Sequence, residues 1–221
     1  MRAILANTGL FLRGEGGFAS RQATSRPGWL LPVMICCFAP IYGATMGSFE
    51  LTSSTRLYIV AFSAAKVPLL LLATSGLCLP GFFVLNTLMG LREDFAEALR
   101  AILAGQAGLS IALASLAPLT RFWYFSGSSY RAALLFNATM FALATVAGQA
   151  VMLRYYRVLI ARRPQHRIML AAWLGLYAFV GIQMGWVLRP FIGDPALPAA
   201  FFRPEPFSNA YVVIVRLALG H

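Results

Sequence analysis

Charged side chains are scarce in this chain: they make up 11% of its 221 residues, against 59% hydrophobic residues. An average soluble domain is about 25% charged and about 45–50% apolar, because water has to wet its surface. So little charge excludes a water-soluble globular domain of this length. The mean hydropathy is +0.72, and apolar runs of roughly 18 residues, the length that crosses the hydrocarbon core of a bilayer, recur along the chain.

Acidic residues and lysine are scarcer still. Only 7 side chains are acidic and Lys66 is the only lysine, yet the net charge is +11. On a soluble protein this charge would suggest nucleic acid, but here the arginines separate apolar runs, where basic side chains anchor helix ends and meet anionic headgroups. We therefore expect the lipid bilayer, and no nucleic acid, as a partner. The preference for arginine is typical of a GC-rich bacterial genome, so we expect the bacterial inner membrane.

Cysteine, histidine and catalytic signatures are also lacking. The three cysteines, Cys36, Cys37 and Cys78, lie inside apolar runs without a CxxC pair, which excludes a disulfide framework or metal site. No GxSxG, HExxH, Walker or Rossmann pattern occurs, and His166 lies in a basic stretch. We expect no catalytic residue, no metal, no cofactor and no enzyme activity. An enzyme acting on lipid at Glu50 and Arg189 is a third alternative.

Five apolar runs are present, and they predict an all-α fold, a polytopic transmembrane helix bundle with about five spanning helices plus interfacial helices. The transmembrane domain is expected over 29–192, with spans at about 29–48, 67–91, 99–119, 132–153 and 168–192. Residues 1–28 are expected to form a cytoplasmic tail, because their apolar patch is too interrupted for a signal sequence. Residues 193–221 are expected to form an exoplasmic segment with a short interfacial helix at 209–219, or a sixth span there.

The segments between and within these spans carry further signals. The mixed stretch 50–66 predicts an interfacial or re-entrant helix. Pro40 predicts a bend in the first span, and Pro80-Gly81 predicts a kink or a locally broken helix in the second. A basic connection is expected between the last two spans, with Arg154, Arg157, Arg162, Arg163 and Arg167. More basic residues fall on the side of the N-terminal tail than on the other side, which predicts a cytoplasmic N-terminus.

Small residues recur at a spacing of four. Gly43 and Gly47 form a GxxxG pattern in the first span, and Gly181 and Gly185 form another in the fifth. This spacing lines up small residues on one helix face, where the backbone of a second helix can approach closely. The pattern predicts helix packing, either within the bundle or at a dimer face.

Amide side chains lie inside the expected spans, whereas aspartate, glutamate and histidine do not lie deep in any of them. These amides either line a polar path or form hydrogen bonds between helices: Asn86, Gln106, Asn137, Gln149 and Gln183. After the fifth span, Pro190 and Gly193 predict a turn that brings Arg189 to Asp194. We expect an ion pair at the membrane surface there, or a cation that receives a headgroup or a substrate carboxylate.

Residues 60–150 resemble the Yip family of five-span, Rab-interacting membrane proteins and its bacterial relatives. The resemblance rests on the segments Lys66–Leu72, Leu79–Phe83 and Asn86–Gly90. It implies five spans, a cytoplasmic N-terminus and a membrane-organising scaffold, without a Rab partner in a bacterium. It carries over no functional residue.

These observations favour a membrane scaffold or accessory subunit without catalytic activity. Its partner, a membrane protein or a second copy of itself, is expected to bind through helix packing and through the basic connection around Arg154 to Arg167. The alternative is a small transporter or channel component, whose path would follow the amides of the second to fourth spans and the Pro80-Gly81 break.

Overall fold

The computed structural model describes residues 29–50, 57–127, 129–193, 200–202 and 211–212. Its main helices follow one another as α2 (Leu30–Gly47), α3 (Leu57–Leu88), the short 3₁₀ turn η3 (Arg92–Asp94), α4 (Phe95–Phe125), α5 (Tyr130–Arg162) and α6 (His166–Val187). Five of the described helices are long and apolar enough to cross a membrane, and no strand occurs among the described residues. The prediction of an all-α bundle with five spanning helices is confirmed, and the architecture is compatible with a multi-pass membrane protein.

Three helices, α3, α4 and α5, are longer than the expected spans, whereas α2 and α6 are slightly shorter, with α6 ending at Val187 and not at residue 192. Residues 57–66, expected in an interfacial or re-entrant helix, are instead the first turns of α3 and continue into it without a break. α4 continues past Pro118 to Phe125. Three of the arginines expected in a connection lie in the last turns of α5: Arg154, Arg157 and Arg162. The expected interfacial helix at 209–219 lies almost wholly outside the described residues, and so does the tail 1–28.

The locally broken helix expected at Pro80-Gly81 is not present, because α3 runs without interruption through both Pro68 and Pro80. Proline is tolerated in such a helix where neighbouring helices and local adjustments satisfy the freed backbone groups. Gly81 faces α6, since a Cβ atom built on it would lie 3.7 Å from Leu176 Cδ2. α2 likewise continues through Pro40.

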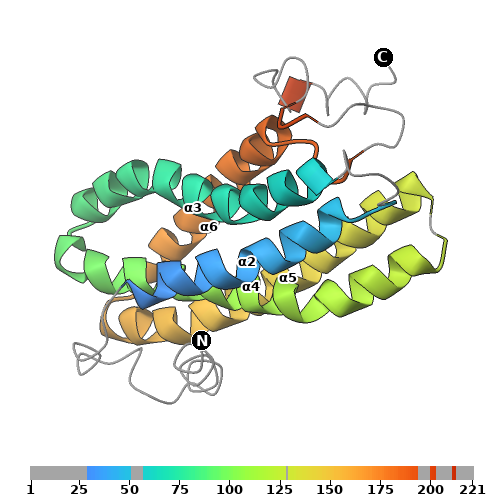
Figure 1. The fold of residues 1–221 in the computed structure, drawn as a ribbon. Coiled ribbons are helices and arrows are strands. Elements are labelled where there is room, and N and C mark those ends of the chain that lie inside the picture. The colour runs from blue at the N-terminus through green and yellow to red at the C-terminus, as the bar shows by residue number, and fades with distance from the viewer. Residues whose placement is uncertain (1–28, 51–56, 128, 194–199, 203–210, 213–221) are drawn as a thin grey trace.

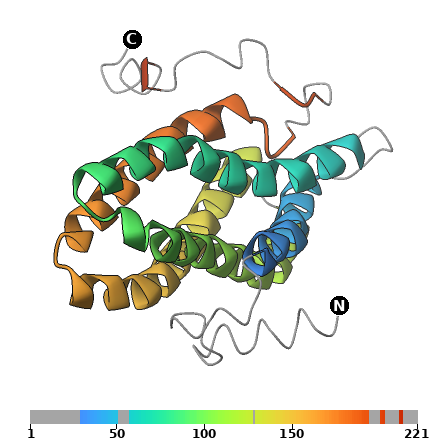
Figure 2. The same cartoon turned by 90° about the vertical axis from the view of Figure 1, so that its left-hand side faces the viewer.

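The helices alternate in direction. The α3–α4 and α5–α6 connections lie at one end of the bundle, and the α4–α5 connection lies at the other (Figure 1). α6 packs on α3, α3 on α2, α2 on α4 and α4 on α5, whereas α5 and α6 make few contacts with each other. Figure 2 shows the helices as an open ring in this order. α4 is the most buried of the five helices, with 61% of its apolar stretch buried, against 22% for α5 and 17% for α6.

Glycines set the two closest helix crossings. Gly47 lies against the backbone of α3, where an added Cβ would fall 2.7 Å from both Ile59 O and Val60 Cα. Gly43 lies one turn earlier, and its Cβ would overlap the Ser63 carbonyl oxygen. The expected packing of Gly43 and Gly47 is therefore within the chain. α4 and α5 approach in the same way, since a Cβ on Gly148 would fall 2.8 Å from Gly105 O.

Substitution of Gly43 by alanine should destabilise the bundle, because the new methyl group has to push α2 and α3 apart. We expect Gly43→Ala to lower the free energy of unfolding by about 1–3 kcal/mol, the usual cost of overpacking. Denaturation by SDS in mixed micelles measures the change. Gly76→Ala on α3 is the matched control, since a Cβ there meets nothing within 4 Å. Equal stability of the two variants would contradict the close crossing.

Candidate functional site

A buried hydrogen-bond cluster joins α2, α4 and α5 around Asn137. The Asn137 amide accepts from Tyr42 Oη at 2.9 Å and donates to Tyr124 Oη at 2.6 Å and to Ala133 O at 2.7 Å. Thr120 Oγ1 in turn donates to Tyr42 Oη at 3.4 Å. Asn137 is only 2% exposed. An amide at this depth is costly unless it is bonded, so the cluster braces three helices against one another.

The other predicted amides lie apart from this cluster. Gln106 on α4 accepts from Tyr177 Oη of α6 at 3.1 Å. Asn86 donates to Phe82 O in its own helix at 2.8 Å, and its Oδ1 is buried without a hydrogen-bond partner. Gln149 Oε1 is buried in the same way, and Gln183 lies half-buried on α6. Asn137 and Gln106 thus act as hydrogen-bonding braces, the second of the two roles that the sequence leaves open.

Lys66 is fully buried inside the bundle, which the sequence does not predict. Its Nζ donates to Pro190 O at 2.7 Å and lies 4.8 Å from the ring centroid of Phe201. One turn earlier, Ser63 Oγ donates to Phe191 O at 2.5 Å. Both bonds fix the segment that follows α6 against α3. The signal in the sequence is the lone lysine ahead of an apolar run, since an ionisable group within a span has to find a partner.

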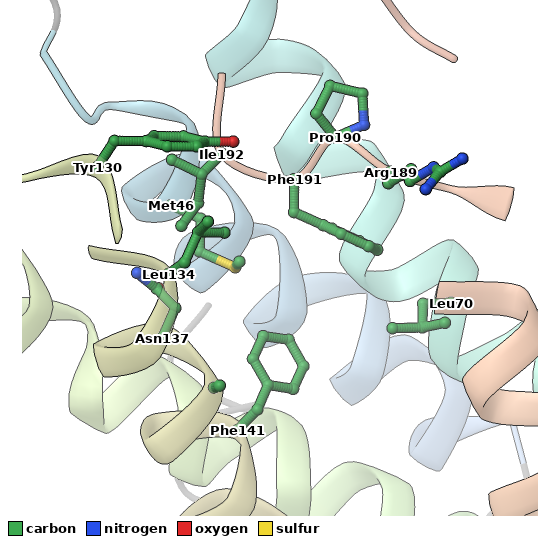
Figure 3. A pocket seen from close by; sticks show the side chains of 11 residues that line it. Met46, Leu70, Tyr130, Leu134, Asn137, Phe141, Arg189, Pro190, Phe191 and Ile192 are labelled. Carbon is green, nitrogen blue, oxygen red and sulfur yellow. The ribbon is translucent and has the colours of Figure 1, made fainter. Parts of the chain in front are cut away.

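A pocket of about 400 Å³ lies beneath this segment (Figure 3). Its lining comes from α2, α3 and α5 and from the chain after α6, and it is mostly apolar: Met46, Leu70, Tyr130, Leu134, Asn137, Ala138, Phe141, Arg189, Pro190, Phe191 and Ile192. Asn137 is the amide of the buried cluster, and Arg189 is the only charged residue in the lining. The pocket is therefore an apolar cavity with one cationic residue, Arg189, in its lining.

Arg189 is held by an aromatic ring. Its guanidinium carbon lies 3.4 Å from the ring centroid of Trp186, a stacking that suits the planar guanidinium group. Asp194, the predicted ion-pair partner, lies outside the described residues, so the pairing stays a prediction. Glu50, the acid of the lipid-acting alternative, is not in the lining of the pocket that contains Arg189.

A second polar site joins the two connections at the opposite end of the bundle. Asp94 Oδ2 lies 3.2 Å from His166 Nε2 and 3.9 Å from Arg163 Nε. Arg163 Nη1 also donates to Gly90 O at 2.9 Å. His166, which the sequence places in a basic stretch, is fully buried, and its ring packs edge-on against Tyr156. These contacts join the α3–α4 connection to the α5–α6 connection. Within the described ranges, no three metal-ligating side chains come together.

The two glycines of the predicted α6 pattern differ from those of α2. A Cβ on Gly181 would meet Thr74 Cγ2 at 3.6 Å, an ordinary contact, and a Cβ on Gly185 would meet nothing within 4 Å. Gly181 therefore borders the α3–α6 contact, while Gly185 lies outside it. The α6 pattern does not produce a close crossing inside the bundle.

Asn137→Leu should destabilise the fold by about 1–3 kcal/mol, because it leaves two buried tyrosine hydroxyls without their amide partner. Thr145→Val is the control, since the Thr145 hydroxyl donates only along its own exposed helix face to Phe141 O. The free energy of unfolding in mixed micelles is the readout. A loss no greater for Asn137→Leu than for Thr145→Val would contradict a bracing role.

Asp94→Ala should cost more stability than Glu97→Ala. Glu97 pairs with Arg162 at 2.7 Å, but these side chains are 28% and 38% exposed, and such surface pairs contribute about 0–1 kcal/mol. Asp94 instead partners a buried histidine, so its loss removes a shielded contact. Thermal unfolding of both variants in nanodiscs gives the order, and a larger loss for Glu97→Ala would refute it.

No protein-family model, curated protein or solved structure matches this chain. The resemblance to the Yip family thus stays a prediction from the sequence, and what supports a function is the geometry of the helices and the pocket.

Proposed function

We propose that this chain is a non-catalytic membrane scaffold or accessory subunit that binds a spanning helix of another membrane protein along the outward face of α6. The observation that carries the proposal is the environment of two α6 glycines. Among the described residues, an added Cβ on Gly175 or Gly185 would meet no atom of a neighbouring segment within 4 Å. Both lie on the same helix face as Ala171 and Ala178, which are exposed.

Glycine in a helix interior is less favourable than alanine by about 1 kcal/mol. Elsewhere in this bundle that cost is offset by close backbone contact, as at Gly47 against Ile59 and at Gly148 against Gly105. Around Gly175 and Gly185 on α6 no such contact is made by the described residues. Small residues on a lipid-facing helix allow a second helix to approach closely, so an external helix is the natural counterpart.

The setting of this proposal is the bacterial inner membrane, with the N-terminus in the cytoplasm. The end of the bundle that holds Arg162, Arg163 and Arg167 would then face the cytoplasm, in keeping with the positive-inside rule. Arg162 and Arg163 are engaged with Glu97 and Asp94, and they tie the bundle together there. Partner recognition is therefore assigned to α6 and not to this basic end.

Co-purification tests the proposal. The tagged chain is extracted from its own host in a mild detergent, and bound proteins are identified by mass spectrometry. We expect a stoichiometric partner with the native chain and at least a tenfold loss of it with Gly175→Ile or Gly185→Ile, because a branched side chain keeps the second backbone away. Ala142→Ile, on the exposed face of α5, is the matched control and should retain the partner.

The mass of the native particle separates a foreign partner from a second copy of this chain. A particle with the mass of one chain, free of other proteins, would refute the scaffold proposal. A dimer lost in the two α6 variants would keep the α6 interface but make the partner a second copy.

A small transporter or channel component is the second candidate, and the observation that favours it is the pocket beside Asn137. A wet path predicts that Asn86→Cys, Asn137→Cys and Gln149→Cys react with a water-soluble thiol reagent in sealed vesicles. We expect no reaction at Asn137→Cys, because the amide it replaces is bonded among Tyr42, Tyr124 and Ala133. Rapid labelling at all three positions would favour transport.

A further inference from the structure

The arginines at the end of the bundle that holds the α3–α4 and α5–α6 connections fall into two groups. Arg162 and Arg163 are engaged with acidic side chains. Arg100 of α4 and Arg157 of α5 are exposed, and no described residue forms an ion pair or a hydrogen bond with either guanidinium group. Both charges are therefore available to a partner from outside the described part of the chain.

Arg100 and Arg157 lie at the same level of the bundle, on two neighbouring helices. α4 and α5 run in opposite directions (Figure 1), and the contact of 2.7 Å between Glu97 and Arg162 joins them at this end. Arg100 is five residues from the first residue of α4, and Arg157 is five residues from the last residue of α5. At the helical rise per residue, each lies about 7.5 Å inside its helix end.

The side chains around Arg157 indicate that this level borders the hydrocarbon layer of a membrane. Val158 is adjacent in the sequence and is 38% exposed, and Leu153, one turn earlier on the same side of α5, is 37% exposed. An arginine in this setting lays its methylene stem along the apolar surface and keeps its guanidinium group among the headgroups. The partner that reaches such a cation is therefore a component of the membrane surface.

Two other exposed arginines at this end lie further out along the helix axes. Arg92 belongs to the η3 turn, and Arg167 is the second residue of α6. Both are closer to bulk water than Arg100 and Arg157, and salt screens exposed charges in water strongly. An anion should therefore bind more weakly at this outer pair than at the pair that lies deeper.

We propose that Arg100 and Arg157 form a binding surface for anionic phospholipids on the outward side of α4 and α5, with a lipid phosphate group on each guanidinium group. Arginine suits a phosphate because its planar fork can give two parallel hydrogen bonds. A zwitterionic headgroup carries a cation of its own beside the phosphate, which the arginines repel. An acidic segment of a soluble protein would have to descend to the level of Leu153 and Val158, where the exposed side chains are apolar.

Native mass spectrometry of the full chain released from vesicles tests this surface. The vesicles contain equal amounts of phosphatidylglycerol and phosphatidylcholine with the same acyl chains. We expect the native chain to retain phosphatidylglycerol over phosphatidylcholine by about tenfold, since each basic side chain near an anionic membrane surface strengthens binding. The double variant Arg100→Gln and Arg157→Gln should bind the two lipids about equally, because glutamine keeps a polar side chain but removes the charge.

A second double variant with the same loss of charge serves as the matched control. Arg92→Gln and Arg167→Gln together remove two exposed arginines from the same end of the bundle, and this variant should keep most of the preference for phosphatidylglycerol. Arg131→Gln removes an exposed arginine at the opposite end of α5 and should behave like the native chain. Thermal unfolding in the same vesicles shows whether each variant is folded.

Three outcomes would overturn the inference. The first is a native chain that retains both lipids equally. The second is an equal loss of preference in the two double variants, which would assign the effect to net charge. The third is removal of the preference by inorganic phosphate at the concentration of the lipid, which would make the site one for free anions. The inference does not depend on the scaffold proposal, since Gly175→Ile on α6 should leave the ratio of bound lipids unchanged.

Discussion

A single ammonium group organises one end of this bundle. Lys66 lies within the long apolar helix α3 and its side chain is fully buried. Burial of a charged amine is costly unless the amine is hydrogen-bonded. Lys66 bonds the backbone carbonyl of Pro190, which draws the chain after α6 onto α3 and holds it over the cavity. Together with the hydrogen bond from Ser63 to Phe191, this contact positions the segment that contains Arg189 and covers the pocket.

Several other buried polar side chains are also hydrogen-bonded, and their partners differ along the length of the bundle. Asn137 bonds two tyrosines in the half that contains the pocket, Gln106 bonds Tyr177, and Asp94 holds His166 at the far end. Between these levels the helices meet through glycine and alanine. Close backbone contact joins α2 to α3 and α4 to α5, whereas α5 and α6 make few contacts with each other.

Much of this architecture could be predicted from local sequence. Apolar length identifies five helices, and the spacing of Gly43 and Gly47 identifies a packing face, because both depend on residues close in the chain. The helix ends were predicted less well, since arginines such as Arg154 and Arg157 continue α5 where a connection was expected. The pocket could not be predicted, because the residues that line it come from segments far apart in the sequence. Nor could the burial of His166, which depends on Asp94 of a different connection.

The order in which the helices pack has a consequence for biogenesis. α3 and α4 both pack on α2, and α5 packs on α4, whereas α6 passes over its two predecessors in the chain and packs on α3. Because Pro190 follows α6 in the chain, Lys66 obtains this carbonyl partner only after α6 has been synthesised. A segment made late thus supplies the hydrogen bond that a buried amine in an earlier helix requires.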